Sequence, residues 1–393
     1  MDMVKNNNPV WAEIDLQAIA SNLKLVKQLV GAKTKIMSVV KADGYGHGSI
    51  EVARTIAASG TDAFGVARFD EGVALRKSGL QHPILVFGYT PPEAAEDIIK
   101  YGLRQTVFSK SYAELLNEKA RIFGGRIKVH VKIDTGMGRL GFVPEHLNGK
   151  HGNNKDQKSF LGNDIASMSK LTNLAVDGIY THLASSDSAD KTSARNQLTL
   201  FNKIVSFLET EGLHFPDIHA ANSAAIVGLP ESHLTMVRPG IMLYGLHPSV
   251  DHQTDDNVVL QPAMQVKARI AQIKDVPDGF KVSYGHSYVT PGATRLATVP
   301  VGYADGYNWR LSSTGVMLVG GYRAPVVGRV CMDQSVLDVG HIEGIRCGDE
   351  VVIMGRQKKA VLSAEEIADQ LGTINYEIVS TIMARVPRLY KTF

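Results

Sequence analysis

Short apolar runs alternate with longer amphipathic stretches between residues 36 and 245. The runs are rich in Val and Ile, and the stretches between them repeat their apolar positions with a helical period. Eight such runs begin at Ile36, Ala63, Ile84, Gln105, Ile127, Val176, Asp217 and Met236. Continuous apolar runs are typical of strands in buried parallel sheets. The pattern therefore predicts a closed (β/α)8 barrel, the TIM barrel, although an open sheet of seven units would look similar.

The pattern changes after a polar segment that ends at Asn257. From there, apolar and polar residues alternate, with Gly and Pro between the runs, which predicts a C-terminal mainly β domain that is either a barrel or a sandwich. One helix is expected from Ser363, because Glu366 three residues later completes a capping box. We expect domains at 10–248 and 249–393. The polar stretch 145–164 has no period, and we interpret it as a surface loop rather than a functional lid.

Composition narrows the class of protein. Hydrophobic residues make up 44% of the 393 residues, which favours a folded protein over a disordered one. Forty-two basic and 39 acidic residues leave a net charge of +3, too little to predict binding of nucleic acid. No run approaches the roughly 20 apolar residues that span a membrane, and no signal peptide is apparent. Two cysteines, Cys331 and Cys347, suit a reducing compartment, so a cytoplasmic location is expected.

Lys41 is the first candidate for chemistry. It follows an apolar run and opens the glycine-rich turn KADGYGHG. In a barrel this position is the catalytic end of a strand, and a lysine beside apolar surface can lose its proton and form a Schiff base. A surface lysine beside a turn is the plainer interpretation, but Tyr45 and His47 in the same turn favour a site.

Two segments near the last predicted strands could bind a phosphate. Arg238 and Gly240 lie in VRPGIMLYG, where barrels commonly bind phosphate groups. Asn222 and Ser223 in HAANSAA offer an amide and a hydroxyl at the start of a helix. Plain helix capping explains Asn222 and Ser223 equally well.

A third group of candidates follows two middle strands. KIDTGMGRLG contains Lys132, Asp134 and Arg139, and the guanidinium of Arg139 could bind a carboxylate. Structural turns would explain the glycines of this motif equally well. YTHLASSD places His182 at another strand end, where a lone histidine is more often a core residue. Its position, shared with Lys41 and Arg139, favours a site.

The C-terminal half adds tyrosines and one polar turn. Tyr284, Tyr303 and Tyr376 lie in KVSYGHSY, VGYADGY and TINYE, and Met332 and Asp333 lie in GRVCMDQS. Tyrosines in strands normally pack and tether their hydroxyl, so none of them predicts catalysis alone. The chain contains no CxxC, HExxH or P-loop motif, and we expect no metal site.

Taken together and in order, these motifs resemble the signature of the bacterial alanine racemases over nearly the whole chain. The resemblance implies a pyridoxal 5'-phosphate barrel of fold type III, a C-terminal β domain and a homodimer with each active site at the interface. It also implies that Lys41 holds the cofactor as an aldimine and acts as base on one face of the substrate. Tyr284 of the other subunit would act on the opposite face, assisted by His182 and Arg238.

The resemblance assigns the remaining site residues. Arg238 would contact the pyridine nitrogen of the cofactor, and Arg139 and the backbone of Met332, beside Asp333, would contact the substrate carboxylate. Lys132 would be carbamylated and orient Arg139. The expected phosphate ligands are Tyr45, Ser223, Gly240, Ile241 and Tyr376, and Asn222 lies in their motif. A substrate corridor would be formed by Tyr303, Arg329 and Asp187, with Trp309 where relatives often carry arginine.

We therefore expect interconversion of L-alanine and D-alanine, supplying D-alanine for peptidoglycan. A non-catalytic pyridoxal phosphate carrier would have no need of Tyr284 and Met332. A barrel decarboxylase would place a carboxylate where Arg238 stands. A serine racemase is the nearest rival, because one hydroxyl in a pocket changes binding energy little.

Overall fold

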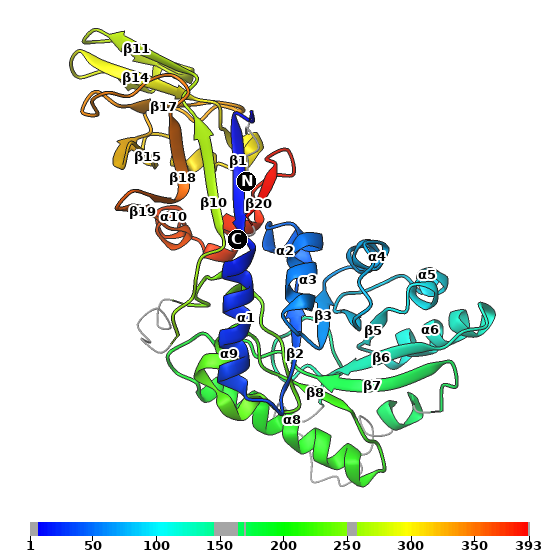
Figure 1. The fold of residues 1–393 in the computed structure, drawn as a ribbon. Coiled ribbons are helices and arrows are strands. Elements are labelled where there is room, and N and C mark those ends of the chain that lie inside the picture. Colours follow the sequence, from blue (N-terminus) through cyan, green and yellow to red (C-terminus); the bar gives the residue numbers. More distant parts are fainter. Residues whose placement is uncertain (1–6, 145–163, 169, 250–257, 392–393) are drawn as a thin grey trace. The chain divides into compact units, whose positions relative to one another are not determined.

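The computed structural model describes residues 7–144, 164–168, 170–249 and 258–391. The chain forms two compact units (Figure 1). One contains residues 19–44 and 49–261, and the other contains residues 1–18, 45–48 and 262–393. The expected loop 145–164 lies, apart from Asp164, outside the described residues.

The first unit contains a closed barrel of eight parallel strands, as the sequence predicts. Each strand pairs with its neighbour in the chain, and β2 pairs with β9 to close the ring. The strands are β2 (Lys35–Val39), β3 (Ala63–Val66), β4 (Ile84–Val86), β5 (Arg104–Val107), β6 (Ile127–Lys132), β7 (Leu174–Tyr180), β8 (Asp217–His219) and β9 (Met236–Val237). β9 is shorter than the apolar run 236–245, because Pro239 has no N–H to donate to a ladder.

Most of the longer helices follow a barrel strand and bury an apolar face. In α6, for example, Ser109 caps the N-terminus by accepting the N–H of Tyr112, and Tyr112, Leu116 and Ala120 are buried at helical spacing. The helices of this part of the chain are α1 (Leu16–Val30), α2 (Lys41–Tyr45), α3 (Ser49–Ala58), α4 (Phe69–Lys77), η1 (Pro92–Ala94), α5 (Ala95–Lys100), α6 (Lys110–Ile122), α8 (Thr192–Thr210), α9 (Ser223–Gly228), η3 (Pro230–Ser232) and η4 (Ile241–Tyr244).

The second unit is mainly β, as expected, and includes a strand from the start of the chain. β1 (Val10–Asp15) pairs antiparallel with β10 (Met264–Arg269) and parallel with β20 (Arg388–Lys391). Residues 10–18 thus group with the C-terminal residues, and the unit differs at this end from the expected segment 10–248. The pairing joins residues about 250 to 380 positions apart, so a division of the chain by sequence order cannot show it.

The remaining strands either extend the sheet of β1, β10 and β20 to seven strands or form two small sheets, β11-β14-β17 and β12-β13. They are β11 (Gln272–Val276), β12 (Lys281–Val282), β13 (Tyr288–Val289), β14 (Thr294–Val299), β15 (Val316–Val319), β16 (Tyr322–Pro325), β17 (Ser335–Asp338), β18 (Glu350–Gln357) and β19 (Ala360–Leu362). The short helices are η6 (Tyr284–His286), η7 (Tyr303–Asp305), η8 (Trp309–Leu311), α10 (Ala364–Leu371) and α11 (Asn375–Ser380). Ser363 caps α10 by accepting the N–H of Glu366, while the Glu366 carboxylate pairs with Arg323.

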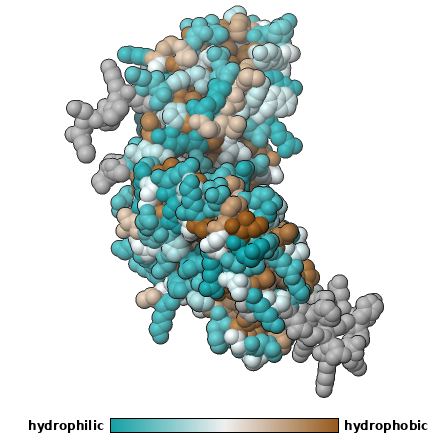
Figure 2. Space-filling view, turned by 90° about the vertical axis from the view of Figure 1, so that its right-hand side faces the viewer, coloured by the Kyte–Doolittle hydropathy of each residue, from teal (hydrophilic) through white to brown (hydrophobic). Residues whose placement is uncertain are grey.

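The surface is mixed in character. In the view of Figure 2, hydrophilic side chains cover most of the face, and apolar side chains appear in small groups among them. Among the described residues, no helix combines the length and the apolar character that crossing a membrane would require.

Candidate active site

Five candidate side chains follow the carboxyl ends of barrel strands. Lys41 lies two residues after β2, Lys132 ends β6, and His182 lies two residues after β7. Ser223 begins the helix that follows β8, and Arg238 directly follows β9. The carboxyl ends of the strands in a (β/α)8 barrel meet at the face that carries catalysis in enzymes of this fold. The barrel therefore brings these residues of distant sequence position to one end.

Lys41 opens a left-handed turn. The φ angle is positive at every residue from Ala42 to Gly46, including the non-glycine residues Ala42, Asp43 and Tyr45. Each non-glycine residue in this conformation costs roughly 1–2 kcal/mol, and such strain concentrates at functional sites. The Glu71 carboxylate accepts the N–H of Ala42 at 2.6 Å, and Asp43 Oδ1 accepts the N–H of Ser49 at 2.8 Å. These bonds hold the turn and so fix where Lys41 begins.

The environment of Lys41 favours its neutral amine. Partial burial lowers the pKa of Lys41 and the charge of Arg139 lowers it further, while Glu71 acts in the opposite direction. A neutral amine is the form that attacks an aldehyde.

Lys132 is buried, with 6% of its surface exposed, and carries the strongest perturbation among the lysines described. Burial and the neighbouring charges of Arg139 and Arg238 lower the pKa of Lys132 to about 8, opposed by Asp134. Its Nζ lies 5.7 Å from the centre of the Tyr180 ring. A large share of the Lys132 amine is therefore already uncharged at a pH slightly above 7.

Asp134 organises the loop that carries Arg139. Its carboxylate accepts four consecutive backbone N–H groups, from Gly136 to Arg139, at 2.8 to 3.1 Å. Burial alone would raise the pKa of Asp134, but these donors hold it below its ordinary value. The carboxylate thus fixes the backbone that precedes the guanidinium.

Arg238 is almost fully buried and held by several acceptors. Its Nη2 donates to the carbonyl of Thr181 at 2.9 Å and to that of Ala220 at 3.0 Å. The same nitrogen lies 3.3 Å from Nδ1 of His182, and Nη1 lies 2.8 Å from Nδ1 of His219. Burial lowers the pKa of Arg238 to about 10, which leaves the guanidinium charged at neutral pH. Burial, Arg238 and Arg139 lower the pKa of His182, which is therefore neutral.

The segment around α9 couples two backbone elements. Ser223 Oγ accepts the N–H of Gly240 at 2.9 Å, just before the buried Ile241 begins η4. Asn222 caps α9 by accepting the N–H of Ala225, and it also accepts the hydroxyl of Ser186 at 2.8 Å. The capping interpretation of Asn222 is confirmed, and a contact of Asn222 with a cofactor stays a prediction.

Five further predicted residues, Tyr45, Tyr284, Met332, Asp333 and Tyr376, lie in the second unit. Tyr45 is buried, which raises its pKa, and its ring centre lies 6.2 Å from that of Tyr376. Tyr284 is 75% exposed and Met332 is 53% exposed. Asp333 forms an ion pair with Arg385 at 2.8 Å. The structure therefore brings Tyr45 and Tyr376 together and leaves Tyr284 and Met332 on the surface of their unit.

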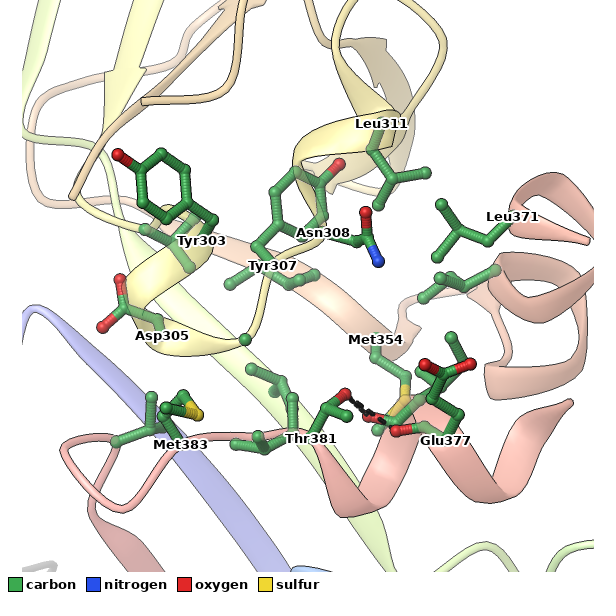
Figure 3. A pocket seen from close by; sticks show the side chains of 18 of the residues that line it. Tyr303, Asp305, Tyr307, Asn308, Leu311, Met354, Leu371, Glu377, Thr381 and Met383 are labelled. Atoms are coloured by element: carbon green, nitrogen blue, oxygen red, sulfur yellow. Dashed lines mark hydrogen bonds between the residues drawn. The ribbon is translucent and has the colours of Figure 1, made fainter. Parts of the chain in front are cut away.

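The second unit has a cavity of about 290 Å³ (Figure 3). None of the cationic residues described above lines it. Tyr303 and Trp309 are among its lining residues, and much of the lining is apolar, including Leu311, Met354 and Leu371. Among the sites described, the chemistry therefore concentrates at the barrel end.

Sequence reasoning missed two contributors to the barrel site. Glu71 supports the turn after Lys41 from the first helical turn of α4 and carries no motif. His219 contacts Arg238 from inside the predicted strand at 217–221, where a histidine is normally a core residue. Only the folded arrangement of these segments reveals the two contacts.

The barrel end gathers Lys41, Lys132, Arg139 and Arg238 within mutual electrostatic range, with few carboxylates beside them. Such a site favours an anionic ligand beside a reactive amine. Together with the fold, it defines a (β/α)8-barrel enzyme with a lysine at its catalytic end.

Comparisons with known proteins identify the family. Residues 14–248 match the alanine racemase N-terminal domain, and residues 263–390 match the alanine racemase C-terminal domain. The alanine racemase of Desulfosudis oleivorans is 48% identical and covers 98% of this chain and 97% of its own. That of Methanococcus maripaludis is 43% identical over 98% of this chain and 99% of its own. This chain belongs to the alanine racemase family and is a racemase.

Solved structures agree with this assignment. The alanine racemase of Clostridium difficile 630 matches with a TM-score of 0.91 and 40% identity, over 98% of this chain and 97% of its own. A histidine racemase from Leuconostoc mesenteroides matches with a TM-score of 0.87 and 27% identity, over 98% of this chain and 99% of its own. The fold is therefore shared by racemases named for different amino acids.

Proposed function

We propose that this protein interconverts L-alanine and D-alanine with pyridoxal 5'-phosphate as cofactor, and that D-alanine serves peptidoglycan synthesis. The observation that carries the proposal is the Lys41 amine, whose pKa is lowered at the catalytic end of a barrel rich in cations. Alanine is favoured over serine or histidine because many relatives, at 41 to 48% identity, are alanine racemases.

The residues present fit the cofactor. Lys41 supplies an amine for its aldehyde, and Arg238 supplies a donor for the pyridine nitrogen. Ser223 Oγ already accepts the N–H of Gly240, so its own proton is available to a phosphate oxygen. By the family resemblance, Ile241, Tyr45 and Tyr376 complete the phosphate ligands. When bound, pyridoxal phosphate supplies an electron-withdrawing ring that acidifies the α-hydrogen of an attached amino acid.

Two groups would move the proton. Racemisation requires an acid and a base on opposite faces of the α-carbon, and we assign these roles to Lys41 and to Tyr284 of the other subunit in a homodimer. The lowered pKa of Lys41 makes its amine available as base at a lower pH than that of an ordinary lysine. The exposure of Tyr284 in the single chain is consistent with a site completed by a second copy.

Neutral His182 and charged Arg238 would support the tyrosine. His182 accepts at Nδ1 from Arg238, so a neutral ring carries its proton on Nε2. That nitrogen can donate to the phenolate of Tyr284 and so stabilise it beside a positive charge.

Arg139 would bind the substrate carboxylate with its planar guanidinium, together with the backbone of Met332. Lys132 would hold Arg139 in place after its neutral amine reacts with carbon dioxide. In that reaction the amine nitrogen forms a bond to the carbon of carbon dioxide, one C=O π bond breaks, and the nitrogen releases a proton. The product is an anionic carbamate, which attracts Arg139, whereas the protonated lysine would repel it. Asp333 forms an ion pair with Arg385. A direct role in substrate binding would therefore require its carboxylate to contact both Arg385 and the substrate.

The corridor to the site would include Tyr303, Arg329 and Asp187. Trp309 stands where relatives often carry arginine, and the Arg329 guanidinium lies 4.8 Å from the centre of its ring. Stacking on a tryptophan keeps one cation in place here and does not add a second. We therefore expect a less positive corridor than in those relatives.

The test compares substrates and products. The pyridoxal phosphate-loaded protein is incubated with L-alanine, L-serine or L-histidine, and chiral chromatography follows the D-enantiomer. Alanine should turn over with the highest kcat/KM, and Lys41→Ala should abolish turnover and the visible absorbance of the bound cofactor. A yellow protein without turnover would indicate a carrier, and carbon dioxide release would indicate a decarboxylase.

A further inference from the structure

Two buried histidines extend inward from Arg238 through the barrel. His219 Nδ1 lies 2.8 Å from Arg238 Nη1, and His219 Nε2 lies 2.9 Å from His130 Nδ1. Both histidine side chains are fully buried. Tyr180 stacks on His219, with ring centres 4.7 Å apart and an interplanar angle of 5°. A Cβ on Gly178 would lie 2.6 Å from the His130 ring, so glycine is required beside it.

The far end of this pair meets a group of charges on neighbouring strands. His130 Nε2 lies 4.0 Å from Asp217 Oδ2 and 3.4 Å from Arg104 Nη1. Asp217 also binds Lys35 at 2.6 Å and Arg104 at 2.9 Å, and Arg104 binds Asp177 at 3.0 Å. His130, Asp177 and Asp217 are close enough to share a metal ion, but Arg104 and Lys35 already supply the positive charge there.

The position of every proton in this chain follows from Arg238. A guanidinium only donates hydrogen bonds, so Nδ1 of His219 is the unprotonated nitrogen. A neutral His219 then carries its proton on Nε2 and donates it to Nδ1 of His130. His130 in turn carries its proton on Nε2, facing Asp217. Arg104 is a competing donor at that end, but its 3.4 Å contact is longer than the 2.8 Å contact of Arg238.

The opposite tautomers would destabilise the site. They would place an N–H of His219 against an N–H of Arg238 at 2.8 Å, and a protonated ring would do the same. Burial and the nearby arginines lower the pKa of His219, and burial and Arg104 lower that of His130 to about 3, so both rings are neutral. The charged groups that act on the pair are Arg238, Arg104, Asp217 and Lys35.

We propose that His130 is a positioning residue: with His219 it forms an uncharged, one-directional hydrogen-bond chain that locks Arg238 as a donor at the catalytic end of the barrel. The role in catalysis rests on the proposed function, whereas the direction of the chain does not. A buried donor left without an acceptor is strongly disfavoured, so loss of the His130 acceptor would release His219 and with it Arg238.

Neutron diffraction from crystals of the full-length protein as purified tests the direction of the chain, since it locates deuterium on each ring nitrogen. The expected result is deuterium on Nε2 and none on Nδ1 in both His130 and His219. Deuterium on Nδ1 of either ring would overturn the proposal. This measurement requires no racemase activity, so its failure is distinct from a failure of the proposed function.

Variants of the loaded enzyme test the effect on Arg238. His130→Leu removes the acceptor and should lower kcat for alanine about tenfold, alter its pH profile and change KM little. His130→Asn retains an acceptor oxygen and should recover most of the lost kcat.

Ser38→Ala is the matched control, because Ser38 is equally buried in the barrel and its side chain bonds only Thr61 in the contacts described. It should keep the pH profile. A folded His130→Leu variant with wild-type kcat and pH profile would overturn the positioning role.

Discussion

Burial and nearby charges lower the pKa of Lys41. Because Arg139 lowers the pKa of Lys41, replacing it by Arg139→Gln should raise that pKa. The neutral amine would then appear only at higher pH, and the rate at which pyridoxal phosphate attaches to Lys41 should shift to higher pH. Borohydride trapping followed by peptide mass spectrometry measures this rate. Arg68→Gln, at an exposed arginine paired with Asp70, should leave the profile unchanged. An unshifted profile in Arg139→Gln would contradict this account.

Lys132 should react with carbon dioxide as its amine loses a proton. The pKa of about 8 leaves the amine mostly charged below pH 7 and mostly neutral above pH 9. With labelled bicarbonate, a carbamate signal in the carbon-13 spectrum should therefore increase over this pH range and be absent in Lys132→Arg. A protein without the signal at pH 9 would show that Lys132 remains a bare amine.

The left-handed turn after Lys41 is an element that tolerates little change. Gly46 has a φ of +82°, and an added Cβ would lie 2.1 Å from the carbonyl oxygen of Val379. Gly46→Ala should therefore lower the free energy of unfolding by more than the roughly 1–2 kcal/mol that a positive φ alone costs. Gly372→Ala is the control, because Gly372 has a φ of +67° with nothing within 4 Å of its Cβ. If urea unfolding gave the same loss of unfolding free energy for Gly46→Ala and Gly372→Ala, the close contact at Gly46 would be relieved at no cost.

The barrel elements could be predicted from the sequence because each buried strand forms its own apolar run. β3 coincides with the predicted run AFGV, and the mainly β character of the second unit also followed from alternation. The assignment of β1 could not be predicted, because its partners in β10 and β20 lie hundreds of residues away. The hydrogen-bond chain from Arg238 through His219 to His130 could not be predicted either, since both histidines resemble ordinary residues within strands until the barrel closes.

Lys41, Arg139, His182 and Arg238 were singled out because they follow predicted strands, and the structure places them at one end of the barrel. Glu71 gave no signal, because a glutamate in a first helical turn is common and favourable for other reasons. Candidate site residues at the ends of strands could thus be predicted from the sequence. The residues that support them from neighbouring elements could not.

The whole molecule should work as a dimer with shared sites. Lys41→Ala and Tyr284→Phe chains are each expected to be impaired, the first in both directions and the second unequally in the two directions. Unfolding and refolding an equal mixture should produce heterodimers with one intact site. About half the dimers would be mixed and half of their sites intact, which predicts recovery of about a quarter of wild-type activity. Wild-type chains treated alike are the control, and no recovery would contradict a site built from two subunits.

The central claim is that Lys41 and Tyr284 exchange the α-hydrogen of alanine on opposite faces. The most direct test incubates D-alanine with the pyridoxal phosphate-loaded protein in deuterium oxide and follows optical rotation and deuterium at the α-carbon together. The account predicts that rotation decays to zero while the L-alanine formed carries deuterium, and that Lys41→Ala shows neither change. Constant rotation with no deuterium incorporation would contradict it.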